Sequence, residues 1–144
     1  MTRQEIIELA TSLAQQAGLD PALVLAVIEQ ESAFNPWAVR FEPRFYEKYT
    51  KPMNLTDTEE YCRAISWGLM QVMGQVGREQ GFPRRYLSEL LLPENGLYHG
   101  MLKLKRCIAK TETIAQALLR YNGGGNPKYD DEVLEKYEQW KKLL

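Results

Sequence analysis

An acidic residue, Glu31, lies on the apolar side of a predicted helix, where a charged group is costly. On a helical wheel of about 100° per residue, Glu31 follows Val27 by four positions and Ile28 by three, near the centre of an apolar stripe. Burial and the negative end of the helix dipole both favour the protonated carboxylic acid there. Such an acid can give a proton to a leaving group, which is general-acid catalysis. Pairing with an arginine, or exposure at the helix end, would be a purely structural alternative.

The elements that position Glu31 are predicted to be helices throughout the chain. A capping box opens the first helix at Thr2, and Gly18 ends it. Asp20-Pro21 opens the second helix, which carries Glu31, and Asn35-Pro36 ends it. Alternating runs of β-branched residues are missing, so we expect an all-α fold without a sheet. Further helices are expected over residues 66–80, 83–91, 93–109, 111–121 and 128–144, with shorter ones after Pro43 and after Thr56.

The composition is that of an ordinary globular domain. The 144 residues carry 18 Lys and Arg against 19 Asp and Glu, a formal net charge of −1, and 44% are hydrophobic. These values exclude a disordered chain, and the missing cationic surplus argues against nucleic acid as a partner. The length predicts a single domain over residues 1–144. No apolar run approaches the roughly 20 residues of a membrane span, and the first residues are polar, so neither a span nor a signal peptide is expected.

The sequence shows no residue pattern for a metal or a cofactor. His99 is the only histidine, so no cluster of histidines can hold a metal, and His99 is expected at the surface or at a helix cap. No cofactor is expected. Cys62 and Cys107 belong to no metal-binding pair. Two free thiols are favoured for them, with a disulfide as the open alternative. Tyr137 and Trp140 are expected to dock the last helix. A run of basic residues is expected to form a solvated helix face: Lys103, Lys105, Arg106 and Lys110.

Three short motifs follow one another along the chain. They are Ile28–Pro36 (IEQESAFNP), Ser66–Met73 (SWGLMQVM) and Ala117–Gly124 (ALLRYNGG). In this order they resemble the catalytic domain of soluble lytic transglycosylases, which are relatives of goose-type lysozyme. The family pattern is Glu-Ser-x-Phe-Asn-Pro, then Gly-Leu-Met-Gln-x-Met, then Tyr-Asn-Ala-Gly. Each motif alone is a weak signal, whereas all three in order on a helical chain are specific. The resemblance covers about residues 5–127, interrupted at 40–63.

The resemblance implies a lysozyme-like helical fold and peptidoglycan glycan strands as the substrate. The bond cut would be the β-1,4 bond between N-acetylmuramic acid and N-acetylglucosamine. Glu31 matches the family's single catalytic acid, which protonates the glycosidic oxygen and then, as a carboxylate, takes the proton of the muramyl C6 hydroxyl. A 1,6-anhydro ring closes without water, so the reaction is a lyase cleavage. Ordinary glycosidases use two carboxylates instead.

The same motifs imply further site residues. Gln71 and Met73 match side chains that the family uses along the glycan groove, although the two do not share a face of the predicted helix, and Met73 fits the core equally well. Tyr121 matches a tyrosine near the catalytic acid, with a core position at the helix end as the alternative. Asn122 is expected to shape the turn that follows it. Ser32 is expected to hydrogen-bond locally, and its role toward the substrate is open.

The chain departs from the family between the first two motifs. Thirty-six residues separate Glu31 from Gly68, where most family members have fewer than half as many, and Gly74 replaces the proline that often follows the second motif. The inserted segment, about residues 40–63, is rich in Phe and Tyr and forms either a surface flap or part of the groove. Glu42 is its candidate for a second carboxylate, which would activate water and give lysozyme-type hydrolysis. A solvated charge is the simpler interpretation of Glu42.

Other interpretations concern the biological setting. A non-catalytic glycan-binding module would keep the groove without an acid, although the presence of Glu31 argues against it. The substrate places the activity at the bacterial cell wall, in the periplasm or outside the cell. The missing signal segment fits a phage or prophage enzyme that lyses bacteria, or a shortened chain. We expect a monomer whose near-neutral charge provides no bulk attraction to an anionic wall.

Overall fold

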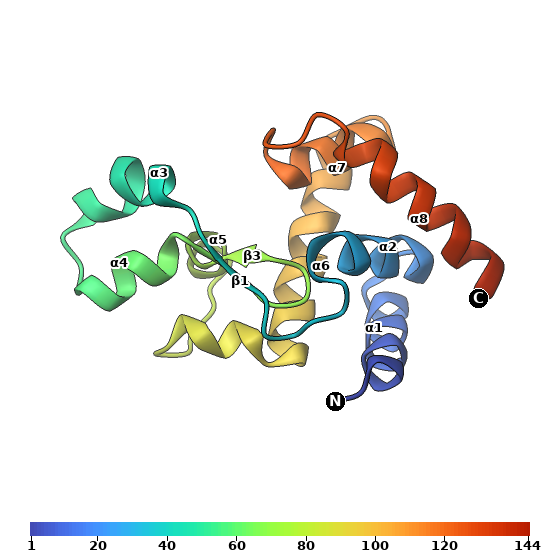
Figure 1. Cartoon of the computed structure of the whole chain (residues 1–144), viewed down its shortest axis with the longest axis horizontal. Helices are drawn as coiled ribbons and strands as arrows, with labels where there is room; N and C mark the ends of the chain where they lie inside the picture. Colours follow the sequence, from blue (N-terminus) through green and yellow to red (C-terminus); the bar gives the residue numbers. More distant parts are fainter. The chain divides into compact units, whose positions relative to one another are not determined.

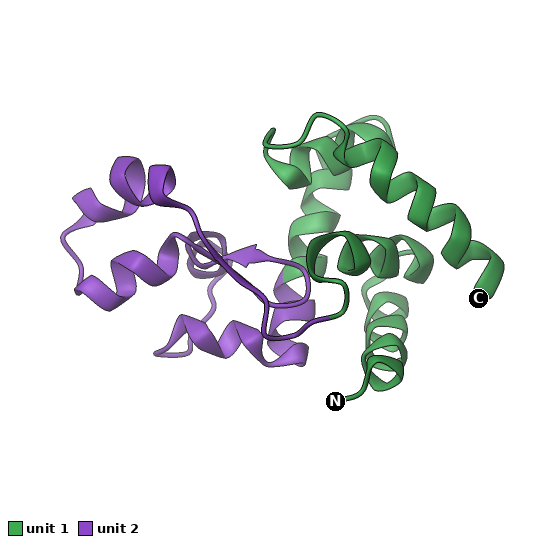
Figure 2. Cartoon of the chain, viewed as in Figure 1, with its two compact units in different colours: residues 1–34, 100–144 green, residues 35–99 purple.

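The computed structural model describes all 144 residues and is mostly helical, with eight α-helices and one small sheet. Figure 1 shows the order of these elements along the chain. The chain forms two compact units, one of residues 1–34 with 100–144 and the other of residues 35–99 (Figure 2). The predicted helical fold class is confirmed.

The first unit is entirely helical. Its elements are α1 (Arg3–Ala17), α2 (Pro21–Ser32), the C-terminal part of α6 (Pro93–Ala109), α7 (Ile114–Asn122) and α8 (Tyr129–Leu143). The predicted ends of α1 are confirmed, because Thr2 and Glu5 form the capping box and Gly18 closes the helix in the left-handed region. Asp20 caps α2 by accepting a hydrogen bond from the Ala22 amide at 3.0 Å.

Helix α2 is the central element of the first unit. Every residue from Ala22 to Ile28 is buried, so the helix is enclosed on all sides rather than along one stripe. Its main neighbours are α1 and α8. Helix α8 docks as predicted, since the Trp140 indole donates to Glu29 Oε1 at 3.1 Å and the Tyr137 hydroxyl donates to the Asp20 carboxylate.

The second unit mixes short helices with a sheet. Its elements are β1 (Val39–Phe41), α3 (Pro43–Phe45), the π-helical turn η1 (Tyr46–Thr50), the 3₁₀ turn η2 (Lys51–Met53), α4 (Asp57–Arg63), β2 (Ile65–Trp67), β3 (Val72–Met73), α5 (Gly74–Glu79), the 3₁₀ turn η3 (Leu87–Leu91) and the first residues of α6. The short helices expected after Pro43 and Thr56 are confirmed as α3 and α4.

The predictions of no sheet and of a helix over residues 66–80 are wrong. The three strands form an antiparallel sheet in the order β1-β2-β3, with Ser66 paired to Arg40 on one side and to Met73 on the other. The physical reason lies in the connecting turn, where Gly68 (φ +73°) and Gln71 (φ +52°) adopt left-handed conformations that interrupt a helix. Only the last part of the range, α5, is helical.

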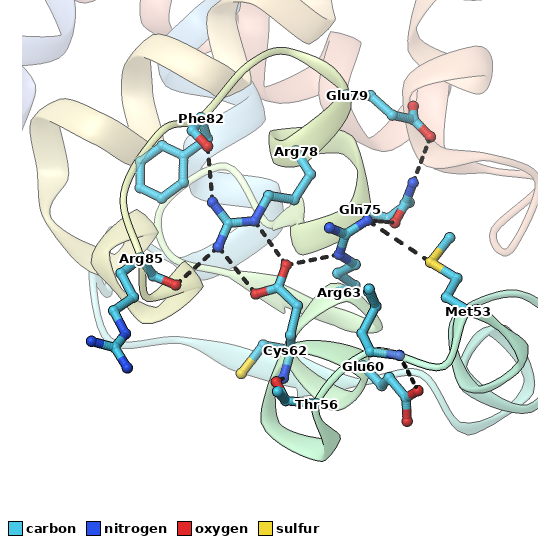
Figure 3. A network of polar contacts seen from close by, with 12 residues as sticks. Met53, Thr56, Glu60, Cys62, Arg63, Gln75, Arg78, Glu79, Phe82 and Arg85 are labelled. Atoms are coloured by element: carbon cyan, nitrogen blue, oxygen red, sulfur yellow. Dashed lines mark hydrogen bonds and ion pairs between the residues drawn. The ribbon is translucent and has the colours of Figure 1, made fainter.

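The inserted segment is fastened to the second unit by an ion-pair network (Figure 3). Arg78 on α5 donates to both carboxylate oxygens of Glu59 on α4, at 2.8 and 3.0 Å. Arg63 donates to the same carboxylate at 2.8 Å. Arg78 also donates to three backbone carbonyls of the following loop, those of Phe82, Arg84 and Arg85. The inserted segment is therefore held within this unit, and whether it is a surface flap or part of the groove stays a prediction.

The remaining predictions about single residues have mixed outcomes. Cys62 and Cys107 are both free thiols, the first half-buried and the second buried. The surface or helix-cap position expected for His99 is wrong, because the residue lies inside α6 and is only 6% exposed. It packs edge-on against Phe82, and its Nδ1 lies 2.7 Å from Gln80 Oε1, so the polar atom is satisfied inside the unit. No helix combines the length and the apolar character that a membrane crossing requires.

Candidate active site

The carboxyl group of Glu31 lies in the last turn of α2 and is half-buried. The Tyr129 hydroxyl, from the first turn of α8, donates a hydrogen bond to Glu31 Oε2 at 2.8 Å. Tyr129 is 3% exposed, so this bond is shielded from water. Burial, and then the negative charge of Glu31, raise the pKa of Tyr129 well above its usual value. The phenol therefore remains a neutral donor at any pH at which an enzyme works.

The backbone directly after Glu31 is strained. Ala33 (φ +50°) and Phe34 (φ +63°) both occupy the left-handed region, which residues with a Cβ seldom adopt. The Phe34 ring is buried and is held by Trp140, at a centroid distance of 5.8 Å, and by the Arg3 guanidinium 4.5 Å above it. Helix α2 ends at Ser32 with Ala33 as its left-handed cap, and these contacts hold the Phe34 side chain just beyond that end. Such strain is common at functional sites, where the surrounding packing maintains it.

Tyr121, the tyrosine of the third motif, belongs to the same cluster. Its ring is 2% exposed and lies nearly parallel to the Tyr129 ring, with the centroids 6.5 Å apart. Burial, followed by the charge of Glu31, raises the pKa of Tyr121. The structure thus brings Tyr121 and Glu31 into one electrostatic environment, although they are far apart in the sequence.

Lys103 is the residue of this cluster that sequence reasoning missed most clearly. Its ammonium nitrogen lies 4.0 Å from the centre of the Tyr121 ring, a cation–π contact. Burial lowers the pKa of Lys103, and the negative charge of Glu31 opposes that effect. The expectation of a solvated face holds for the other members of its basic run but is wrong for Lys103, which is half-buried.

A signal for Lys103 exists in the sequence. It lies three residues after Gly100 and four before Cys107, beside the buried face of α6 that also holds Leu104. The wheel argument that singled out Glu31 would therefore also have singled out Lys103. Tyr129 carries no such signal, because its contact with Glu31 depends on how α8 docks.

Ser32 and Asn122 both take part in local hydrogen bonds of the first unit. The Ser32 hydroxyl donates to the Ile28 carbonyl at 3.2 Å, one turn earlier in α2. Asn122 Oδ1 accepts from the Asn126 amide at 2.9 Å, across the glycine turn that Gly123 opens in the left-handed region. Asn122 therefore shapes the loop between the two helices that supply Tyr121 and Tyr129.

The other predicted site residues lie in the second unit. The Gln71 amide nitrogen donates to the carbonyls of Ala38 and Gly68, at 3.0 and 2.9 Å, and so holds the turn between β2 and β3. Met73 ends β3 and is half-buried. Glu42 forms an ion pair with Arg40, with its Oε1 3.2 Å from Nε. The sequence expectation that Gln71 and Met73 lie on a helix is wrong, and their contact with a glycan stays a prediction.

The Glu31 carboxyl and the buried phenols of Tyr121 and Tyr129 thus lie together in the helical first unit. The ionisable groups of this cluster include a carboxyl, two phenols and the ammonium group of Lys103. No three His, Cys, Asp or Glu side chains are grouped so that they could hold a metal ion. The chain matches the transglycosylase SLT domain family over residues 8–143, and it belongs to that family. No characterised protein and no solved structure matches the chain. The chain is therefore a lysozyme-like, transglycosylase-type domain that acts on peptidoglycan.

Proposed function

We propose that the chain is a lytic transglycosylase that cleaves the β-1,4 bond between N-acetylmuramic acid and N-acetylglucosamine. The Glu31 carboxylic acid gives its proton to the glycosidic oxygen as the bond from that oxygen to the muramyl C1 breaks. The muramyl C6 hydroxyl oxygen then bonds to C1, and its proton passes to the Glu31 carboxylate. The products are a 1,6-anhydromuramyl end and a free 4-hydroxyl, no water is consumed, and the acid is regenerated.

The observation that carries this proposal is the hydrogen bond from Tyr129 to Glu31. The bond fixes the position of one carboxylate oxygen at the end of α2. It also stabilises the carboxylate that forms when Glu31 has given up its proton. Tyr129 does not compete as the acid, since burial and the charge of Glu31 raise its pKa. One carboxyl group can therefore act first as acid and then as base.

Hydrolysis of the same bond would need a second carboxylate that activates water. Glu42 is the acid that the sequence offered for this role, and it is paired with Arg40. The ion pair indicates that Glu42 is a charged residue bonded within the inserted segment. It gives no support to Glu42 as a base that activates water. We therefore prefer the lyase reaction, and the mass of the product separates the two, because an anhydro end is one water lighter than a reducing end.

The test is Glu31→Gln, with Glu135→Gln as the matched control. The amide keeps the size of the side chain and a hydrogen-bonding oxygen but has no proton to transfer at neutral pH. Glu135 is exposed on α8, so the same change there is expected to be silent. We expect Glu31→Gln to slow the release of soluble fragments from purified peptidoglycan by about 100-fold or more. Release at the wild-type rate would refute the role of Glu31, and wall binding without any fragments from the wild type would favour a glycan-binding module.

The remaining expectations follow from the substrate and from the family match. With peptidoglycan as its substrate, the domain would act on the bacterial wall in the periplasm or outside the cell. Because the match spans both compact units, we propose that residues 1–144 work as one functional domain. A monomer is sufficient, since Glu31, Tyr121 and Tyr129 all come from one chain.

A further inference from the structure

Lys103 places a positive charge inside the cluster of phenols and the carboxyl that forms the candidate site. It extends from the C-terminal part of α6, and its ammonium group lies 4.0 Å from the centre of the Tyr121 ring. Tyr121 in turn stacks on Tyr129, whose hydroxyl binds Glu31. Burying a lysine is unfavourable unless a negative charge or a ring face compensates it. Here both are present, because Glu31 interacts electrostatically with Lys103.

The other ionisable groups of this cluster are neutral near pH 7. Burial is the main effect that raises the pKa of Cys107, Tyr121 and Tyr129, so none of them carries a charge there. Lys103 and Glu31 are the members of the cluster that can be ionised at that pH. Charged groups on the neighbouring faces of α2 and α8 are bonded elsewhere: Glu29 to Trp140, Glu132 to Asn126 and Gln30, and Lys136 to Gln30. Arg120, on α7, is exposed.

We propose that Lys103 is a positioning residue for the reaction above, and that its ammonium group balances the negative charge that Glu31 acquires when it gives its proton to the glycosidic oxygen. This inference rests on the proposed function of Glu31. A carboxyl that acts first as an acid and then as a base must be stable enough in both its protonated and its ionised form. Burial among aromatic rings favours the acid, and a nearby cation favours the carboxylate. Lys103 therefore keeps the base step available without being an acid or base itself.

The first experiment measures the coupling directly. Side-chain carboxyl groups of glutamate, labelled with ¹³C, are titrated by NMR, and the Glu31 resonance is assigned by its loss in Glu31→Gln. Lys103→Met keeps the apolar stem and removes the charge, and we expect it to move the Glu31 titration upward by about one pH unit. Lys103→Arg is expected to restore the wild-type midpoint. Lys110→Met, which removes an exposed charge from the same helix, is expected to leave that midpoint in place.

The second experiment measures the effect on the reaction. The rate of fragment release is measured as a function of pH, and the alkaline limb of this profile reports loss of the Glu31 proton. In Lys103→Met we expect that limb to move to higher pH by the same amount as the Glu31 titration midpoint. A purely structural role would lower the rate at every pH and leave the limb in place. An unmoved Glu31 titration refutes the coupling, and a moved titration with an unmoved limb refutes the effect of Lys103 on the reaction.

A reciprocal measurement covers the case in which Lys103→Met does not fold. Coupling between two sites is mutual, so Glu31→Gln must lower the titration midpoint of Lys103, followed through its ¹³Cε resonance. An unchanged midpoint in that variant refutes the coupling without any substitution at Lys103. The proposed function fails in a different way, namely when Glu31→Gln still releases fragments at the wild-type rate. The two proposals are therefore distinguishable.

Discussion

Replacement of Tyr129 by phenylalanine removes one hydroxyl and little else. The hydroxyl donates to Glu31 Oε2 at 2.8 Å, and the residue is 3% exposed, so water does not readily replace the lost donor. A hydrogen bond to an ionised acceptor contributes about 1.5–3 kcal/mol, which is the expected loss for the carboxylate form. At about 1.36 kcal/mol per pKa unit, the Glu31 titration is expected to move upward by about one to two pH units.

The loss of stability in Tyr129→Phe depends on pH with a defined sign. The hydroxyl stabilises the ionised form of Glu31, so in the wild type its contribution is present above the titration of that carboxyl and is lost as the pH falls through it. We therefore expect the variant to lose about 1.5–3 kcal/mol of unfolding free energy near pH 8 and much less near pH 4. The phenol itself contributes no titration in this range, because its pKa is raised.

The assay is urea unfolding followed by circular dichroism at the two pH values. Tyr98→Phe is the matched control. Tyr98 is 62% exposed, so the substitution there removes a hydroxyl that faces water. A deficit in Tyr129→Phe that is equal at both pH values would show that packing, and not the bond to an ionised Glu31, accounts for the loss. That result would refute the reasoning behind the acid–base site.

Two further predictions concern the second unit. Arg78→Met is expected to lower the unfolding free energy by about 2 kcal/mol near pH 7, because it removes a paired cation that is little exposed. Burial raises the pKa of Glu59, but its bonds to Arg78 and Arg63 outweigh this effect and lower that pKa. The loss of unfolding free energy in Arg78→Met should therefore shrink as Glu59 is protonated on acidification, and urea unfolding near pH 3 measures this. Gly74→Ala is expected to cost about 1–3 kcal/mol in thermal unfolding, because its Cβ would overlap the Cys62 carbonyl oxygen. Gly125→Ala, whose Cβ would have no atom nearer than 3.9 Å, should be nearly neutral, and an equal loss in both would contradict the packing argument.

The helix boundaries of the first unit could be predicted because their causes are local. A Thr-x-x-Glu pattern satisfies the free amides at the start of α1, and Gly18 supplies the left-handed residue at its end. Both signals lie within a few residues of the boundary. The same holds for Asn122 and the glycine turn that follows it, which appear in the third motif and close α7.

The sheet could not be predicted, because its cause is distant in the sequence. Leu69, Val72 and Val76 have helical spacing, yet Gly68 bonds instead to the Ala38 carbonyl, and its Cα approaches the Leu90 carbonyl so closely that a Cβ would lie 3.0 Å from it. Tertiary contacts therefore override the local pattern. The contact of Tyr129 with Glu31 has the same character, since it depends on the docking of α8.

Gly74, where the resemblance led us to expect a proline, packs directly against α4, which lies in the segment expected to be an insertion. Helix α4 belongs to the insertion, and its Cys62 carbonyl lies against Gly74, where any Cβ would overlap it. A proline carries a Cβ and a ring, so it could not occupy position 74 while α4 packs there. The glycine is thus a condition for seating α4, and the ion pair between Arg78 and Glu59 then holds that helix in place.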